Sequence, residues 1–167
     1  MSKKHTYRTA TTWTGNLGEG TSSYTAYLRN FTVSAEGKPD LHGSADPAFR
    51  GDANRWNPEE MLLATVSACH KLWYLHLCAD AGICVTAYTD HAEAVMDEGG
   101  GGNAGHFVSA VLKPRVTVAA GSDRTKALEL HHEAHRLCFI ANSVNFPIEC
   151  RAEIKSEEAA SENPIPV

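Results

Sequence analysis

The sequence contains no apolar run long enough to span a lipid bilayer, so we expect no membrane-spanning segment. The first residues carry two lysines with no apolar stretch behind them, so we expect no secretory signal and a cytoplasmic location. Basic residues are scattered and the formal net charge is −5, which argues against a nucleic-acid partner. Of the 167 residues, 43% are hydrophobic and 21% are charged, which is typical of a globular domain.

The five cysteines form an odd set without a closely spaced Cys-x-x-Cys pair, so a disulfide framework is not predicted. In a reducing compartment such thiols are usually free, and they are either buried as small apolar groups or reactive. Four glycines at 99–102 lack the Gly-Lys-Ser/Thr ending of a phosphate-binding loop, so nucleotide binding is not expected either. The cysteines are therefore the feature to explain.

A helix from Asn57 to about Gly82 is the clearest predicted element. Asn57 suits the N-cap, Pro58 suits the first helical position, and Glu60 completes the spacing of a capping box. Gly82 favours termination. A single apolar stripe follows at steps of three and four residues: Leu62, Val66, Cys69, Trp73 and Leu77. The pattern thus predicts a cysteine in the middle of the buried face.

Strands are predicted on both sides of this helix. Before it, residues 5–15 and 21–37 favour strands and residues 38–56 favour an ordered loop. After it come two strands (83–96 and 106–120) joined by a glycine-rich loop, a second helix from Ser122 or Asp123 to about Asn142, and a closing strand (146–155). This order predicts an α+β protein with a mainly antiparallel sheet, in one domain over 1–155 with a polar C-terminal tail at 156–167.

The cysteines on the two helices have more than one interpretation. Cys69 and Cys138 each lie on an inward face, and spacing alone favours plain core-filling thiols. Cys78, Cys84 and Cys150 are also predicted to fill the core, because nothing ionisable stands at a useful spacing from them. A reactive cysteine needs positive charge or hydrogen-bond donors nearby, and periodicity does not show whether two thiols meet.

Three runs resemble the OsmC/Ohr family of thiol peroxidases: NPEEMLLATVSACH at 57–70, GICV at 82–85 and HHEAHRLCFIANS at 131–143. TTWTGN at 11–16 is similar to the family's first strand, and the likeness covers about residues 11–153. The resemblance implies an OsmC-like intertwined homodimer with two central helices between mainly antiparallel sheets. It also implies reduction of organic hydroperoxides with two cysteines, so no metal or other cofactor is expected.

The resemblance assigns roles to individual residues. Cys69 would attack the peroxide oxygen and become a sulfenic acid, and Cys138 would resolve it to an intramolecular disulfide. A dithiol reductant, often a protein-bound lipoyl group in this family, would restore both thiols. The family's glutamate carries over to Glu59.

The family's arginine does not align directly. One branch places it between the first two strands, but GNLGEGTSS at 15–23 contains none. Another branch places it shortly before the long helix, where Arg50 and Arg55 are both present, and we favour Arg50. A guanidinium favours the ionised form of a neighbouring thiol, and a carboxylate holds the guanidinium in place.

Aromatic residues suggest the class of substrate. Trp73, Tyr74 and Phe139 are candidates to line an apolar site for a bulky alkyl or lipid hydroperoxide, although for each taken singly a plain core position is the better interpretation. Phe139 departs from the family, because many members have proline after the second cysteine. We expect organic hydroperoxides to be preferred over hydrogen peroxide.

Other functions remain open. His131, His135 and Cys138 could chelate a metal, but the zincin pattern fails because glutamate does not follow the first histidine. A Cys–His hydrolase is disfavoured, since Cys69 and His70 are successive helical residues that do not face each other. A non-catalytic alternative keeps the same fold as a redox-sensing or small-molecule-binding protein.

Overall fold

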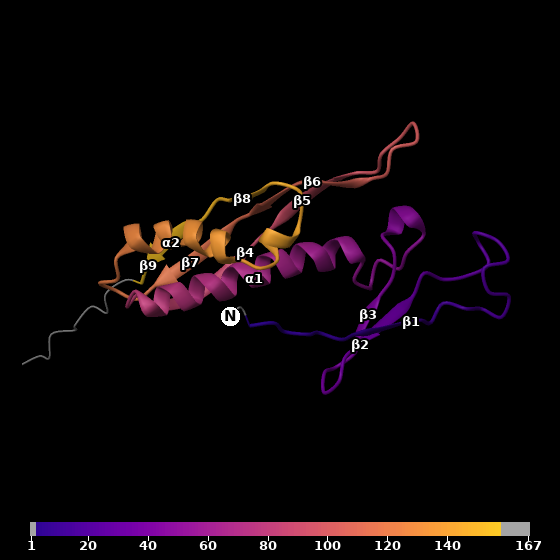
Figure 1. The fold of residues 1–167 in the computed structure, drawn as a ribbon, viewed down its shortest axis with the longest axis horizontal. Helices are drawn as coiled ribbons and strands as arrows, with labels where there is room; N and C mark the ends of the chain where they lie inside the picture. The colour runs from indigo at the N-terminus through magenta and orange to yellow at the C-terminus, as the bar shows by residue number, and fades with distance from the viewer. Residues whose placement is uncertain (1–2, 158–167) are drawn as a thin grey trace, which may run out of the picture. The chain divides into compact units, whose positions relative to one another are not determined.

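The computed structural model describes residues 3–157 (Figure 1). These residues divide into two compact units, 3–62 and 63–157. The predicted tail begins at residue 156, and from residue 158 onward it lies outside the described residues. The prediction of a single domain over 1–155 stays a prediction. No helix within residues 3–157 has the length and apolar character that crossing a membrane requires.

The first unit contains a three-stranded antiparallel sheet in the order β1 (Ala10–Trp13), β2 (Phe31–Ser34) and β3 (Leu41–Gly43). The predicted loop at 38–56 contains β3 and a short 3-10 helix, η1 (Pro47–Phe49). The second strand begins ten residues later than predicted, because residues 18–26 form turns around Gly18 and Gly20, which both have positive φ.

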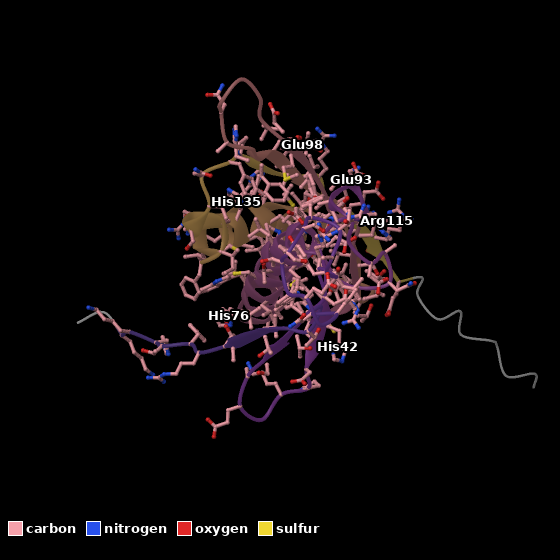
Figure 2. The ribbon with its side chains drawn as sticks, turned by 90° about the vertical axis from the view of Figure 1, so that its right-hand side faces the viewer. His42, His76, Glu93, Glu98, Arg115 and His135 are labelled. Atoms are coloured by element: carbon pink, nitrogen blue, oxygen red, sulfur yellow. The ribbon has the colours of Figure 1, made fainter. Side chains whose placement is uncertain are left out.

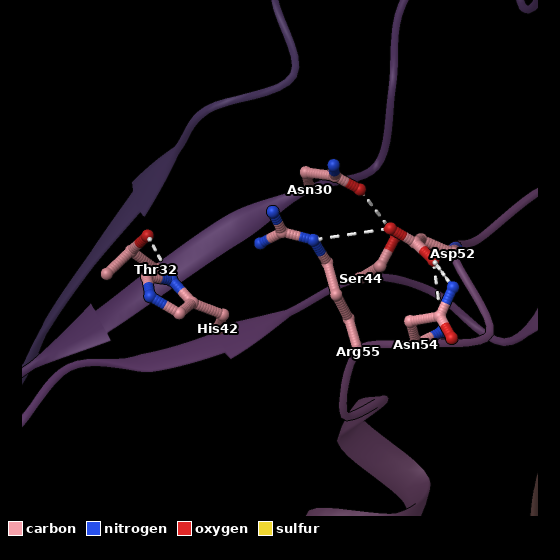
Figure 3. Close-up of polar contacts among 7 residues, drawn as sticks. All are labelled: Asn30, Thr32, His42, Ser44, Asp52, Asn54 and Arg55. Carbon is pink, nitrogen blue, oxygen red and sulfur yellow. Dashed lines mark hydrogen bonds and ion pairs between the residues drawn. The ribbon is translucent and has the colours of Figure 1, made fainter.

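Polar contacts join the connections of this first unit (Figure 3). Ser44 Oγ donates to Asn30 Oδ1 at 3.1 Å and accepts from the Asp52 N–H at 3.1 Å. Asp52 Oδ2 lies 3.4 Å from Arg55 Nε. Within residues 3–62 the buried residues are Gly15, Gly43, Ser44 and Asn57. Hydrogen bonds, rather than buried apolar side chains, therefore hold this unit together.

Helix α1 (Pro58–Asp80) begins and ends at the predicted signals. Asn57 Oδ1 accepts from the Glu60 N–H at 2.7 Å, and Glu60 Oε2 accepts from the Asn57 N–H at 3.3 Å, which confirms the capping box. At the other end, Gly82 adopts φ +70° and the Ile83 N–H donates to Cys78 O at 2.9 Å. This is the geometry of a Schellman termination.

The buried stripe of α1 differs from the predicted one. Its buried residues are Val66, His70, Tyr74 and Cys78, whereas Cys69, Trp73 and Leu77 are half-buried on the adjacent flank. A hydrophobic pattern does not select histidine or tyrosine for the core. Both are buried here because they contact His131, a partner that spacing along one helix does not reveal.

The second unit contains two three-stranded sheets, because each predicted long strand is divided in two. Their strands are β4 (Val85–Asp90), β5 (Glu93–Asp97), β6 (His106–Leu112), β7 (Pro114–Val118), β8 (Ile148–Cys150) and β9 (Glu153–Ser156). The orders are β4-β7-β9 and β5-β6-β8. β6–β8 and β7–β9 are parallel and the other pairs are antiparallel, since a helix connects β7 to β8.

That second helix, α2 (Arg124–Leu137), starts at the predicted N-cap, where Asp123 accepts from the Lys126 N–H. It ends five residues before the predicted boundary, so Cys138 is its C-cap. Residues from α1, α2, β7 and β9, together with Ile83 in the connection after α1, form one apolar core: Tyr74, Cys78, Ile83, Val116, Val118, Ala127, Leu130, Ala134 and Ile154. Exposed charges on the sheets include Glu93 and Arg115 (Figure 2). The predicted α+β fold with two helices is thus confirmed.

Candidate functional site

The structure brings Cys69 of α1 next to Cys138 at the C-terminus of α2. Cys69 is half-buried and Cys138 is fully buried. Burial raises the pKa of the Cys138 thiol, and a side-chain hydrogen bond with Cys69 raises it further. The Cys138 side chain is therefore a thiol at neutral pH, next to Cys69.

The end of α2 fixes the position of Cys138. Its sulfur accepts from the Ala141 N–H at 3.4 Å, and its carbonyl oxygen accepts from the Asn142 N–H at 3.0 Å. These two donors belong to the short 3-10 helix η2 (Ala141–Ser143) that follows. Because the helix stops at Leu137, the Cys138 side chain is held by this turn rather than by a regular helical face.

An apolar pocket of about 290 Å³ opens beside Cys69. It is lined by Cys69, Leu72, Trp73, His76 and Phe139. Trp73 and Phe139 meet edge to face with ring centroids 5.5 Å apart, and Phe139 remains 70% exposed. The prediction that Tyr74 lines this site is wrong, because Tyr74 is fully buried and stacks on His131 instead.

The predicted acidic and basic site residues lie in the unit formed by residues 3–62. Glu59 is in the first turn of α1, and its Oε2 is buried without a hydrogen-bond partner among the described residues. Arg50 is exposed, caps η1, and is the one non-glycine residue within 3–157 with positive φ, at +66°. Arg55 instead pairs with Asp52.

Arg29 was missed by the sequence analysis. It lies in the connection between β1 and β2, which runs from residue 14 to residue 30 and so extends beyond the turn at 15–23. Its guanidinium donates to the carbonyl oxygens of Tyr24 and Tyr27 at 2.7 Å each, and lies 4.3 Å from both ring centroids. The two tyrosines that precede this arginine within five residues were the available signal.

A second cluster joins His70 of α1, His131 of α2 and Cys150 at the end of β8. His70 Nε2 lies 2.9 Å from His131 Nδ1, and Cys150 Sγ lies 3.7 Å from His70 Nε2. The expectation that Cys150 has nothing ionisable near it is wrong, since β8 pairs with β6 and ends beside α1. Cys84 was also predicted to fill the core, but it is exposed, whereas Cys78 is buried as predicted.

The alternative chelate of His131, His135 and Cys138 is not brought together among the described residues. Within residues 3–157, His70, His131 and Cys150 are the one group of three whose possible ligand atoms converge, all within 4.8 Å of one another. The His131 ring meets His70 through a ring nitrogen, and the two rings are nearly coplanar, with planes 6° apart and centroids 5.3 Å apart. His131 and His70 are paired because both lie on the buried faces of their helices, and spacing along one helix does not reveal this.

Known proteins share this fold and this family pattern. The model of the OsmC-like protein family matches residues 51–153. An OsmC-like protein of unknown function from Vibrio cholerae is 28% identical, with a TM-score of 0.78 over 93% of this chain and 100% of that chain.

Two organic hydroperoxide resistance proteins have similar folds. The protein from Elizabethkingia anophelis is 20% identical, with a TM-score of 0.64 over 93% of this chain and 100% of that chain. The protein from Legionella pneumophila is 18% identical, with a TM-score of 0.63 over 90% of this chain and 98% of that chain. A search of curated protein sequences finds no match. Since the family model matches more than half of its length, this chain belongs to the OsmC-like protein family.

Proposed function

We propose that this protein is a thiol peroxidase that reduces organic hydroperoxides, with Cys69 as the attacking thiol and Cys138 as the resolving thiol. The observation that carries the proposal is that these two thiols lie next to each other, with Cys69 at the edge of an apolar pocket. Family membership and the two similar structures named organic hydroperoxide resistance proteins agree with it.

The proposed reaction balances with the two thiols and one external dithiol. The Cys69 thiolate attacks one peroxide oxygen, the O–O bond breaks, and the alkoxide takes a proton and leaves as the alcohol. Cys138 then attacks the sulfenic sulfur, the S–S bond forms, and the leaving hydroxide takes the Cys138 proton to give water. A dithiol such as a protein-bound lipoyl group reduces the disulfide by exchange.

The burial of Cys138 suits its resolving role. Its raised pKa keeps it a thiol while Cys69 meets the peroxide, which leaves one nucleophile facing the pocket. Cys69, in contrast, is half-buried and lines that pocket. The difference in exposure supports the order in which we propose the two cysteines act.

Glu59 and Arg50 are proposed to assist Cys69, as the family resemblance implies. A buried carboxylate oxygen without a partner is costly, which favours a guanidinium as the partner of Glu59. Arg50 holds a left-handed conformation that disfavours side chains, and such outliers cluster at functional sites. Arg29 competes for the role, because it lies in the connection that one branch of the family uses.

We also propose a cytoplasmic homodimer. Five unpaired cysteines suit a reducing compartment. Large apolar side chains of the first unit are exposed in the single chain: Tyr7, Trp13, Leu17, Tyr24, Leu28, Leu41, Phe49 and Trp56. Exposed apolar groups in this number favour burial against a second copy. Light scattering coupled to size-exclusion chromatography should give twice the 18.1 kDa chain mass, and a monomer at micromolar concentration would contradict this.

Hydroperoxide consumption with a dithiol reductant tests the function directly. Cys69→Ser should lose at least about 1,000-fold in rate, because a hydroxyl is a far weaker nucleophile than a thiolate. Cys138→Ser should stop turnover after one reduction, with a sulfenic acid left on Cys69. Cys84→Ser is the matched control at an exposed cysteine and should behave as wild type. If all four proteins behave alike, the non-catalytic alternative is favoured.

Substrate preference tests the role of the apolar pocket. Cumene hydroperoxide should be reduced with a higher kcat/KM than hydrogen peroxide, since only the former contacts Trp73 and Phe139. Phe139→Ala should lower kcat/KM for cumene hydroperoxide by about 5- to 30-fold, equivalent to 1–2 kcal/mol of apolar contact, with little change for hydrogen peroxide. Comparable rates for both peroxides in the wild type would count against the pocket as the substrate site.

A further inference from the structure

We infer that His70, His131 and Cys150 form a buried binding site for one zinc ion, separate from the thiol pair Cys69–Cys138. Two imidazoles and one thiolate are a ligand set that suits zinc. The three side chains come from α1, α2 and β8, so the tertiary structure, rather than a short motif, assembles the set.

The distances are close to those that coordination requires. Zinc–nitrogen bonds of about 2.0–2.1 Å and a zinc–sulfur bond of about 2.3 Å place tetrahedral ligand atoms about 3.4–3.6 Å apart. The two ring nitrogens lie 2.9 Å apart, and Cys150 Sγ lies 3.7 Å from His70 Nε2. The full set lies within 4.8 Å. Small side-chain shifts would therefore create the coordination geometry.

The charge state and orientation of both histidines suit metal coordination. Burial lowers the pKa of His70 to about 4 and that of His131 to about 3, so both rings are neutral at pH 7 and carry lone pairs. Tyr74 stacks on His131 with centroids 3.8 Å apart and planes 10° apart, which fixes the ring orientation. When zinc binds His70 Nε2 and His131 Nδ1, the proton of the hydrogen bond between them moves to the other nitrogen of the ring that carried it. The two histidines therefore release no proton.

Cys150 supplies the negative charge of the site and must lose a proton to do so. Burial raises the pKa of its thiol to about 12, so the ion-free protein holds it protonated and binding releases one proton. Asp90 adds negative potential at both His70 and Cys150. Its carboxylate is held by the Ser67 hydroxyl and the Lys113 N–H. The thiolate and this carboxylate together balance the charge of the zinc ion.

A cavity of about 530 Å³ gives the ion a path to the cluster. His131 and Cys150 line it, together with His132, His135 and Glu149. A water molecule can complete the tetrahedron from this cavity. His70 faces away from the peroxide pocket, because it follows Cys69 on α1 and successive helical side chains point about 100° apart. The metal site and the thiol pair are thus separately testable.

Calorimetric titration of zinc tests the site in a Cys69→Ser/Cys138→Ser background, where the peroxidase thiols cannot hold the ion. The protein is first treated with a chelator. We expect one zinc per chain and release of about one proton, measured in buffers of different ionisation enthalpy. Cobalt(II) at the same site should give a thiolate-to-metal charge-transfer band. Absence of stoichiometric binding, or cobalt binding without this band, would overturn the proposal.

Added substitutions identify the ligands. Cys150→Ser should abolish the charge-transfer band, and both Cys150→Ser and His131→Gln should weaken zinc binding by at least about 100-fold, since even outer partners of a ligand contribute 10- to 100-fold. Cys84→Ser is the matched control and should change neither. Circular dichroism of the ion-free proteins checks the fold. If both ligand variants fold and bind zinc as the background protein does, the assignment is wrong.

Discussion

The two units of the chain are held together by different interactions. In residues 63–157 a continuous core of apolar side chains joins both helices to the β4-β7-β9 sheet. In residues 3–62 no large apolar side chain is buried, and the order comes from strand pairing and from polar contacts around Ser44. One chain can therefore fix the thiol pair by itself, whereas the first unit needs further burial to match that stability.

The largest expected difference between the units comes from one substitution made in each. Tyr74→Ala should lower the free energy of unfolding by about 3–5 kcal/mol, because it removes a fully buried ring from the core. Tyr24→Ala should cost about 1 kcal/mol or less, because Tyr24 is 61% exposed and loses mainly its contact with Arg29. Urea denaturation of both variants measures this. Equal costs would mean that Tyr24 is buried in the assembled protein.

A second comparison concerns how buried and exposed histidines affect stability at acidic pH. The pKa values of His70 and His131 are lowered in the folded chain, so between pH 6.5 and about 4 the unfolded chain binds more protons. The stability from keeping these rings neutral is fully present above pH 6.5 and declines as pH falls toward 4. We expect the free energy of unfolding of chelator-treated protein to fall by an amount on the order of 2 kcal/mol across this window. Urea denaturation at each pH measures this change.

Substitutions in the two units separate this effect from general acid denaturation. His70→Gln lowers stability at neutral pH but should flatten its pH dependence across this window. His42→Gln, at an exposed residue of β3, should keep the wild-type dependence. A wild-type slope retained by His70→Gln would show that the buried histidines are not responsible.

The smallest expected change in stability concerns Arg50 in the first unit. Glycine tolerates the left-handed conformation, so Arg50→Gly should leave the free energy of unfolding within about 1 kcal/mol of wild type. The kcat/KM for cumene hydroperoxide should fall at least tenfold, because the proposed guanidinium is removed while the backbone is kept. Arg55→Gly, whose native side chain pairs with Asp52, should keep the rate.

Arg29 is the alternative that this experiment must separate. If Arg50→Gly keeps full activity and Arg29→Lys loses it, the role moves to the connection between β1 and β2. Lysine keeps the charge but not the two carbonyl contacts that Arg29 makes with Tyr24 and Tyr27, so the change reports on geometry. Full activity in Arg50→Gly, Arg55→Gly and Arg29→Lys would contradict an arginine at the site.

Local sequence signals correctly predicted where the long helix begins and ends, but they did not predict which of its faces is buried. The capping box at Asn57 and the termination at Gly82 depend on neighbours within a few residues, so the sequence contains the whole interaction. The long strands were wrongly predicted to be continuous, because the break at Lys113 depends on which sheet each half joins. The buried face of α1 depends on His131, which is 61 residues from His70.

By itself, the sequence determined both ends of the long helix, the α+β class and the resemblance that singles out Cys69 and Cys138, since each rests on patterns within short segments or on their order. Only the tertiary structure decided that these two thiols meet, that Arg29 belongs to the first connection, and that Cys150 lies beside two buried histidines. Contacts between residues far apart in sequence depend on how the helices and sheets pack, and hydrophobic periodicity carries no information about which polar side chains that packing will bring together.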